Sequence, residues 1–285
     1  MNDFFDRKPD QNEPPPSDRK SPPKQNTGFF LEISEPANQA VIPATSVSVE
    51  GYTSPNALIT ITTNDESSLT LSDTEGRYRS EAELSGGVNQ IEVTGFDNSG
   101  KSLSKSLLLV HSTYLKNGEH GISLIGTVTD LSESTIQIKT LSGEIEQISV
   151  NKDETTYANI MKSSREIEFT DLALGDFIVA IGKSNGNDII EAQRILVTTA
   201  LSESTIRAVW GEVKTYNTKE FIIKDIGGND WSIDAKGGVE VTKLVEDEFK
   251  KAKLTSLKEG DTIIVIGEFD KEEIDANQIH LVTNN

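Results

Sequence analysis

A short pattern occurs twice in the second half of the chain, and this repeat constrains the fold more than any other feature. The sequence LALGDFIVAIG spans 172–182, and LKEGDTIIVIG spans 257–267, 85 residues later. The segments that precede them, 125–150 and 210–235, align at the same offset. Because self-similarity at a fixed period marks a duplicated structural unit, we expect two tandem copies of one small domain.

Each copy reads as three short strands, a long irregular region and two further strands. In the second copy, KLVEDEFKKAKL (243–254) places Leu244, Phe249 and Ala252 on one side of an amphipathic helix. Three strands, a helix and two strands is the order of a five-stranded OB-type barrel. The repeat therefore predicts two OB-like β-barrels, each with a short helix.

The region before the repeat has a different texture, with apolar and polar residues alternating in short segments between turn residues. These segments are 46–53, 57–64, 68–73, 76–84, 89–97 and 105–112. About seven short strands without a helical pattern indicate a two-sheet β-sandwich. The fold class that we expect for the chain is therefore all-β.

The N-terminal segment is rich in proline and poor in aliphatic residues, and it holds six of the nine prolines. Such a segment cannot bury enough apolar surface to offset its ordering entropy. Pro14, Pro15 and Pro16 are an alternative ligand for a polyproline-recognition domain, although the composition favours a solvated spacer. The expected organisation is a disordered tail at 1–28, a sandwich at 29–113, and barrels at 120–199 and 206–285.

Segment 31–112 resembles the bacterial immunoglobulin-like modules of surface and secreted proteins. The matching elements are Pro36, the turn Gly51-x-Thr53-x-Pro55-Asn56-Ala57, Asp73-x-x-Gly76, the strand Gly87-x-Asn89-x-Ile91-x-Val93, and Asp97-x-x-Gly100. The resemblance implies a spacer or binding module without catalytic residues.

Both barrel copies resemble a small bacterial β-barrel domain of unknown function that occurs in tandem in envelope-associated proteins. The shared pattern is an early G-x-V, then L-x-x-G-D-x-I/V-x-V-x-G, and a final A-x-x-I at Ala192–Ile195 and Ala276–Ile279. This resemblance implies a non-enzymatic domain without an agreed ligand, and an extracellular or cell-envelope location.

Charge and composition exclude several classes of function. The net charge is −19, and segments 29–113, 114–200 and 201–285 carry −7, −6 and −6. Acidic surfaces repel phosphate backbones and anionic lipids, which disfavours nucleic acid as a partner. The chain has no cysteine, so disulfides and thiolate metal sites are excluded. No apolar stretch approaches the about 18 residues of a membrane span, and no signal peptide is visible, so a cytoplasmic location stays open.

The repeated Gly-Asp pair, Gly175-Asp176 and Gly260-Asp261, is the first candidate for chemistry. Glycine adopts a positive φ without steric cost, and a short acidic side chain bonds local backbone N–H groups in turns. A general base or metal ligand would need converging partners at defined spacing, and neither copy supplies them. We therefore interpret the pair as a structural turn.

The sequence lacks the ligand spacings of known calcium and zinc sites. Asp73 and Asp97 begin turns that faintly resemble calcium loops, but neither continues into the EF-hand spacing. His111, His120 and His280 lie in different modules without zinc-ligand spacing, and we expect them at surfaces or strand ends. We expect neither a metal nor a cofactor.

The aromatic residues of the second barrel distinguish it from the first. Trp210, Tyr216 and Phe221 replace apolar residues of the first copy and are expected in the core, whereas Trp231 replaces Glu146. An exposed tryptophan can stack on a sugar ring or a nucleobase, or it can cover a barrel end or an interface. Trp231, with Trp210 and Tyr216, is therefore the candidate ligand site.

The sequence contains no nucleophile elbow and no glycine-rich phosphate loop before a helix. Glycoside cleavage by a pair of carboxylates stays open in so acidic a chain, although modules of about 80 residues rarely form the deep cleft that this chemistry needs. We predict no enzymatic activity, but a spacer, adhesion or protein-association module, with envelope proteins or polysaccharide as partners. The alternatives are carbohydrate binding through Trp231 and, less favoured, single-strand nucleic-acid binding.

Overall fold

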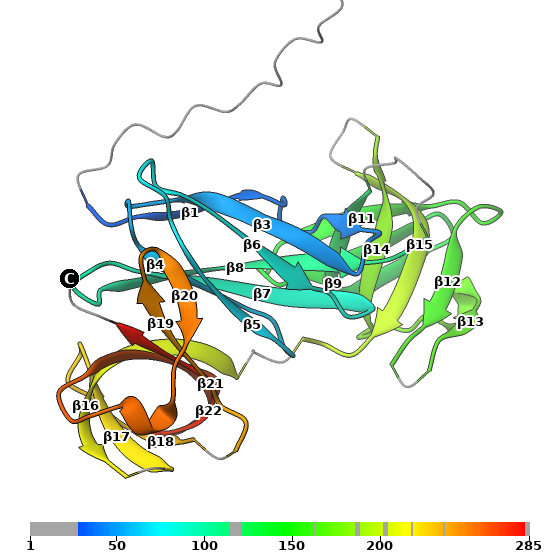
Figure 1. Cartoon of the computed structure of the whole chain (residues 1–285). Helices are drawn as coiled ribbons and strands as arrows, with labels where there is room; N and C mark the ends of the chain where they lie inside the picture. The colour runs from blue at the N-terminus through cyan, green and yellow to red at the C-terminus, as the bar shows by residue number, and fades with distance from the viewer. Residues whose placement is uncertain are drawn as a thin grey trace, which may run out of the picture.

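The chain is all-β, as the sequence predicts (Figure 1). The computed structural model describes residues 28–114, 121–161, 163–185, 189–201, 205–217, 219–235 and 237–282. Apart from Gly28, the predicted tail, with its polyproline run, lies outside the described residues, as does His120. Within these ranges, no helix has the length and apolarity needed to cross a lipid bilayer.

The first region forms two sheets, called the sandwich below. One sheet has the order β1 (Leu31–Glu35), β3 (Ser46–Thr53), β6 (Arg77–Glu83), and the other has the order β2 (Val41–Ile42), β8 (Ser102–His111), β7 (Gly87–Phe96), β4 (Leu58–Thr62), β5 (Ser67–Leu71). Their facing sides pack into one core, with Val49 and Tyr78 from the smaller sheet against Ile59, Ile91 and Leu109 from the larger one. Because side chains alternate along a strand, every second residue of the larger sheet points away from this core.

Tyr78 ties the smaller sheet together. Its O–H donates to the carbonyl oxygen of Glu32 at 2.8 Å, from a ring that is buried in the sandwich core. Gly51 lies under this ring, and a Cβ at that position would overlap both the tyrosine hydroxyl and the Glu32 carbonyl. The glycine in the middle of β3 is therefore needed for the close approach of the tyrosine.

The first repeat closes five strands into a ring, called barrel 1. The strands are β9 (Ile122–Ser132), β10 (Thr135–Thr140), β11 (Ile145–Val150), β14 (Phe177–Ser184) and β15 (Ile190–Thr198). Their pairing order is β11-β10-β9-β14-β15, and a parallel pairing of β11 with β15 closes the ring. A hairpin of β12 (Thr156–Asn159) and β13 (Arg165–Ile167) extends the sheet from β15.

The second repeat has the same strand order and is called barrel 2. Its ring contains β16 (Ile206–Tyr216), β17 (Glu220–Asp225), β18 (Asp230–Asp234), β21 (Thr262–Asp270) and β22 (Glu273–Val282). The parallel pairing of β18 with β22 closes it, and the hairpin of β19 (Glu240–Val245) and β20 (Glu248–Lys251) extends it.

The prediction of a short helix in each barrel is wrong. Segment 243–254 forms part of β19, a tight turn and β20, and only Leu254–Ser256 is helical, as a 3₁₀ turn. Glu246 and Asp247 form the turn with φ of 53° and 61°. In barrel 1 the corresponding region is the β12–β13 hairpin and a 3₁₀ turn at Phe169–Asp171. Pairing of β19 with β22 satisfies backbone groups that a helix would otherwise satisfy internally.

Barrel 1 packs on the outer face of the five-stranded sheet of the sandwich. Val110 of the sandwich is fully buried in one cluster with Ile125, Val179 and Ile181 of the barrel. Backbone contacts reinforce this junction, since the Ser123 N–H donates to the carbonyl oxygen of Gln39 at 3.0 Å. The Ser123 hydroxyl donates to the same carbonyl at 2.7 Å.

Barrel 2 packs on the opposite end of the same sheet face. Leu58 and Phe96 of the sandwich are buried in a cluster with Ile264 and Ile266, and the half-buried Trp210 packs against it. Trp210, Ile264 and Ile266 each lie 85 residues after a member of the barrel 1 contact, namely Ile125, Val179 and Ile181. Both barrels therefore use the same face to dock on one sheet, near opposite ends of its strands β7 and β8 (Figure 1).

Candidate functional site

The Gly-Asp pairs form identical turns in the two barrels. Gly175 and Gly260 have φ of 92° and 88°, a region that favours glycine. The Asp176 carboxylate accepts the Ala173 N–H at 2.9 Å, and the Asp261 carboxylate accepts the Lys258 N–H at 2.8 Å. Each aspartate thus closes its own turn, next to the start of β14 or β21.

The last glycine of each repeated pattern has a packing role. A Cβ on Gly182 would overlap the carbonyl oxygen of Glu191, and a Cβ on Gly267 would overlap that of Asp275. Both glycines sit at register shifts between neighbouring strands. These positions let two backbones approach more closely than a side chain allows.

Asp73 and Asp97 also direct their carboxylates at local backbone. Asp73 Oδ1 accepts the N–H groups of Glu75 and Arg77, and Asp97 Oδ1 accepts those of Ser99 and Lys101. Burial alone would raise the pKa of Asp97, but the hydrogen bonds from Ser99 and Lys101 outweigh it and lower that pKa. Among the described residues, no group of three or more histidine and acidic side chains converges on a metal position.

Trp231 lies at the end of barrel 2, where its ring packs against the barrel core. Its Nε1–H donates to Asp225 Oδ2 at 3.0 Å, and its ring stands edge-on to Phe269 with centroids 5.1 Å apart. Burial raises the pKa of Asp225, but hydrogen bonds from Trp231 and Asn229 outweigh it, so the pKa is lowered. The half-buried ring therefore already has partners on its edge and on one side.

Trp210 lies at the junction with the sandwich. Its ring is 6.0 Å from that of Phe96, and a Cβ on Gly100 would lie 2.6 Å from it. Gly100 has a φ of 85° in the β7–β8 turn. The expectation that Trp210 packs inside the barrel core is therefore wrong, because β16 turns this residue toward the sandwich.

Tyr216 lies at neither of these positions but against the 3₁₀ turn that begins at Leu254. Its O–H donates to the carbonyl oxygen of Leu254 at 2.7 Å, and its ring lies 5.9 Å from that of Phe221. Burial raises the pKa of Tyr216. The three aromatic residues that the sequence singles out thus have separate roles, at the barrel end, at the sandwich junction and against the 3₁₀ turn, and do not form one aromatic surface.

The histidines also lie apart. His111 is half-buried, with Nδ1 3.0 Å from the carbonyl oxygen of Ile42. His280 is only 1% exposed, which contradicts the expectation of a surface or strand-end histidine. A signal for its burial exists in the sequence, because the equivalent residue of barrel 1 is Leu196.

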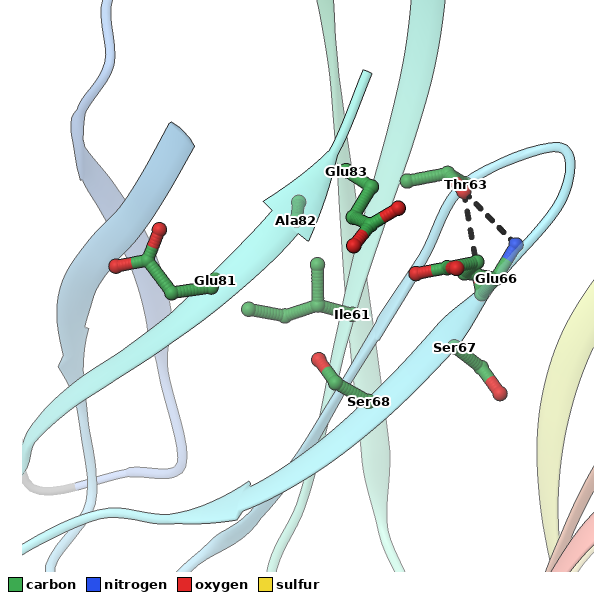
Figure 2. A pocket seen from close by; sticks show the side chains of 8 residues that line it. All are labelled: Ile61, Thr63, Glu66, Ser67, Ser68, Glu81, Ala82 and Glu83. Atoms are coloured by element: carbon green, nitrogen blue, oxygen red, sulfur yellow. Dashed lines mark hydrogen bonds between the residues drawn. The ribbon is translucent and has the colours of Figure 1, made fainter. Parts of the chain in front are cut away.

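A hollow between β5 and β6 is lined by Ile61, Ser68 and three acidic residues (Figure 2). Two of these acidic residues, Glu81 and Glu83, come from β6, and the third, Glu66, precedes β5. Glu66 N–H donates to the Thr63 hydroxyl at 3.0 Å. The hollow thus brings together three carboxylates and no histidine.

Comparisons with known proteins add no family. No family model matches the chain, and no curated protein matches it. Three solved structures align with 11–12% identity. The first is SGBP-B of the mixed-linkage glucan utilization locus of Bacteroides ovatus in complex with a mixed-linkage heptasaccharide, with a TM-score of 0.24 over 91% of this chain and 71% of that one. The others are a Ca2+-stabilized adhesin with which an Antarctic bacterium binds ice (TM-score 0.20, 86% of this chain and 72% of that one) and a 1.5-MDa bacterial ice-binding adhesin (TM-score 0.23, 90% of this chain and 98% of that one). Scores this low carry no argument about this chain.

Proposed function

We propose that the chain is a non-enzymatic β-scaffold for adhesion or protein association at a bacterial cell envelope. The observation that carries the proposal is the docking of both barrels on one face of the sandwich. Large apolar junctions hold domains in fixed relative positions, so the loops of the two barrels are presented as one rigid array. The candidate polar residues, in contrast, are engaged in turns and in packing.

Phe29 and Val282 lie on opposite faces of the same end of β7. The Phe29 ring lies 3.4 Å from where a Cβ on Gly95 would stand, on the inner face of β7. Val282 packs in the cluster that covers Phe96, on the outer face of the same end of β7. The described chain thus enters and leaves at one end of the sandwich (Figure 1).

The family assignments belong to the same proposal. The sandwich is immunoglobulin-like over 29–113, with facing sheets of three and five strands in support. The barrels are OB-like over 120–199 and 206–285. In support, each ring begins with three antiparallel strands, and the third of them pairs in parallel with the last strand of the ring, as β11 does with β15 and β18 with β22.

Two equivalent loop tips are the contact surfaces to test first. Leu141, between β10 and β11, is 59% exposed, and Ile226, between β17 and β18, is 64% exposed. The two residues are 85 positions apart, so the same tip of each barrel carries an exposed aliphatic side chain. Apolar residues on loop ends are suited to burial against a partner.

The test measures retention of beads coated with the full chain on bacterial cells and on envelope polysaccharide. We expect retention by wild type and its loss in the double variant Leu141→Ser, Ile226→Ser. Leu103→Ser, which changes a 36% exposed leucine of β8, serves as the matched control. Surface biotinylation of producing cells tests the location. Recovery only from the cytosol, or undiminished retention by the double variant, would contradict the proposal.

Carbohydrate binding by barrel 2 is the second candidate, and the half-buried Trp231 ring beside Phe269 is the observation that favours it. Aromatic side chains bind sugars through exposed ring faces. A glycan array with wild type and Trp231→Ala decides the matter, because binding that survives the substitution removes Trp231 as the platform. Single-strand nucleic-acid binding ranks last because both barrels are acidic.

A further inference from the structure

His280 lies where barrel 2 meets the sandwich. It forms one row across the barrel sheet with Thr242 of β19, Ile264 of β21 and Trp210 of β16. Ile264 and Trp210 belong to the cluster that contacts the sandwich. Phe249 of β20, which packs against the same cluster, stands edge-on to the imidazole with ring centroids 5.1 Å apart. The histidine is therefore enclosed by the junction and by the β19–β20 hairpin.

The polar atoms of this row are incompletely paired. His280 Nδ1 lies 3.0 Å from the Thr242 hydroxyl, but Nε2 is buried and finds no hydrogen-bond partner in the described part of the chain. The Oε1 atom of Gln278, two residues earlier on the same face of β22, is also buried without a partner there. Unpaired buried polar atoms cost free energy that exposure to water restores. The junction thus contains two atoms that gain partners when it opens.

No acidic residue occupies the cross-strand positions next to His280, which are Thr242 and Ile264. Glu240 of β19 and Lys251 of β20 occupy neighbouring positions on the same face, and their side chains pair with each other at 3.8 Å near the surface. The other charged residues on these strands lie further along their strands or on the alternate face: Glu92 on β7, Arg207, Glu212 and Lys214 on β16, Lys243 on β19, Glu248 and Lys250 on β20, Glu268 and Asp270 on β21, and Glu273 and Asp275 on β22. A proton on His280 would therefore leave a buried charge without an opposite charge beside it.

We propose that His280 makes the junction between barrel 2 and the sandwich acid-sensitive, so that protonation of its ring releases barrel 2 while the barrels stay folded. This goes beyond the proposed function and does not depend on any ligand. Barrel 1 stays docked, because the equivalent position is Leu196 and because backbone hydrogen bonds to Gln39 reinforce its junction. The two homologous contacts thus differ in their response to pH.

The size of the effect follows from linkage. Burial lowers the pKa of His280 to about 4, against an ordinary value of 6.5. A ring that regains its ordinary pKa on release weakens docking by about 30-fold on acidification from pH 7.5 to pH 5. The docked form is favoured above pH 6.5, and its advantage is lost progressively as the pH falls toward 4.

The experiment uses Trp210 fluorescence in the full chain carrying Trp231→Phe, which leaves Trp210 as the single tryptophan. Because the Trp210 ring packs on Phe96 and against Gly100, release of the barrel exposes it to water. We expect its emission to move to longer wavelength between pH 7 and pH 4.5, with the far-UV circular dichroism unchanged. No shift, or a simultaneous loss of the far-UV signal, would overturn the proposal.

Variants identify the group that titrates. His280→Leu, which copies barrel 1, and His280→Gln, which keeps a neutral polar side chain, should both abolish the shift, so the test stands if one of them fails to fold. His111→Gln is the matched control and should leave the shift intact, since the His111 ring lies in the sandwich, with Nδ1 within hydrogen-bond distance of the carbonyl oxygen of Ile42. A shift that persists in either folded His280 variant contradicts the proposal.

Discussion

Val88 and Phe96 lie at opposite ends of the outer face of β7, and each is covered by a different barrel. Between them the same face carries Gln90, Glu92 and Thr94. At about 3.3 Å per residue, the two contacts are about 26 Å apart along the strand. One strand face with apolar ends and a polar middle therefore determines where both barrels dock.

Phe96→Ala should weaken the barrel 2 junction. The side chain is 2% exposed and packs against Trp210, so truncation leaves a cavity between two domains. We expect the free energy of unfolding to fall by about 3 kcal/mol, measured by urea denaturation. Leu103→Ala on β8, where the side chain is 36% exposed, should cost less than about 0.5 kcal/mol. Equal losses in the two variants would argue against a tight junction.

The two kinds of glycine in the repeated pattern should respond differently to alanine. Gly175→Ala adds a methyl group with nothing within 4 Å, so only the positive φ is penalised, and we expect a loss of about 1–2 kcal/mol. Gly182→Ala would place its Cβ on the Glu191 carbonyl, which should prevent barrel 1 from closing. Thermal denaturation and proton NMR dispersion distinguish a weakened fold from a lost one. A folded, stable Gly182→Ala protein is inconsistent with this packing.

Tyr78 should set the alkaline stability of the sandwich. Burial raises the pKa of Tyr78 above its ordinary value of 10.0, so the protonated ring stabilises the fold at pH values below 10. That stabilisation is lost as the pH rises above 10, where the unfolded chain ionises first. Tyr78→Phe should cost about 1 kcal/mol at pH 7 by removing the bond to Glu32. Its melting temperature should fall less than that of wild type between pH 9 and pH 11. Parallel curves would show that Tyr78 does not titrate with unfolding.

The sequence predicts local structure best where the backbone conformation itself requires a particular residue type, such as glycine at a positive φ. The strand predicted at 46–53 is β3 with the same bounds, because alternation and flanking turn residues agree there. Gly175 and Gly260 have the positive φ that their pattern suggests. These features depend on neighbours in the chain, which a sequence displays directly.

Features that depend on tertiary contacts were missed. Segment 243–254 consists of residues that form helices well, yet its pairing with β22 makes it a hairpin, with a turn at Glu246 and Asp247 instead of the usual Asn-Gly. The partners of Trp210 and Phe96 could not be identified, because alternating strands do not reveal which face a second domain covers. His280 could have been recognised as buried by comparison with Leu196.

The most direct test of the account measures the distance between the two barrels. The chain has no cysteine, so Gln147→Cys on β11 and Ser232→Cys on β18 can carry a single pair of spin labels. These exposed positions lie at the same place on equivalent strands, 85 residues apart. At pH 7.5, double electron–electron resonance should give one narrow distance distribution, because both barrels are docked on the same sheet. A broad distribution, as for domains that move independently on linkers, would contradict the account.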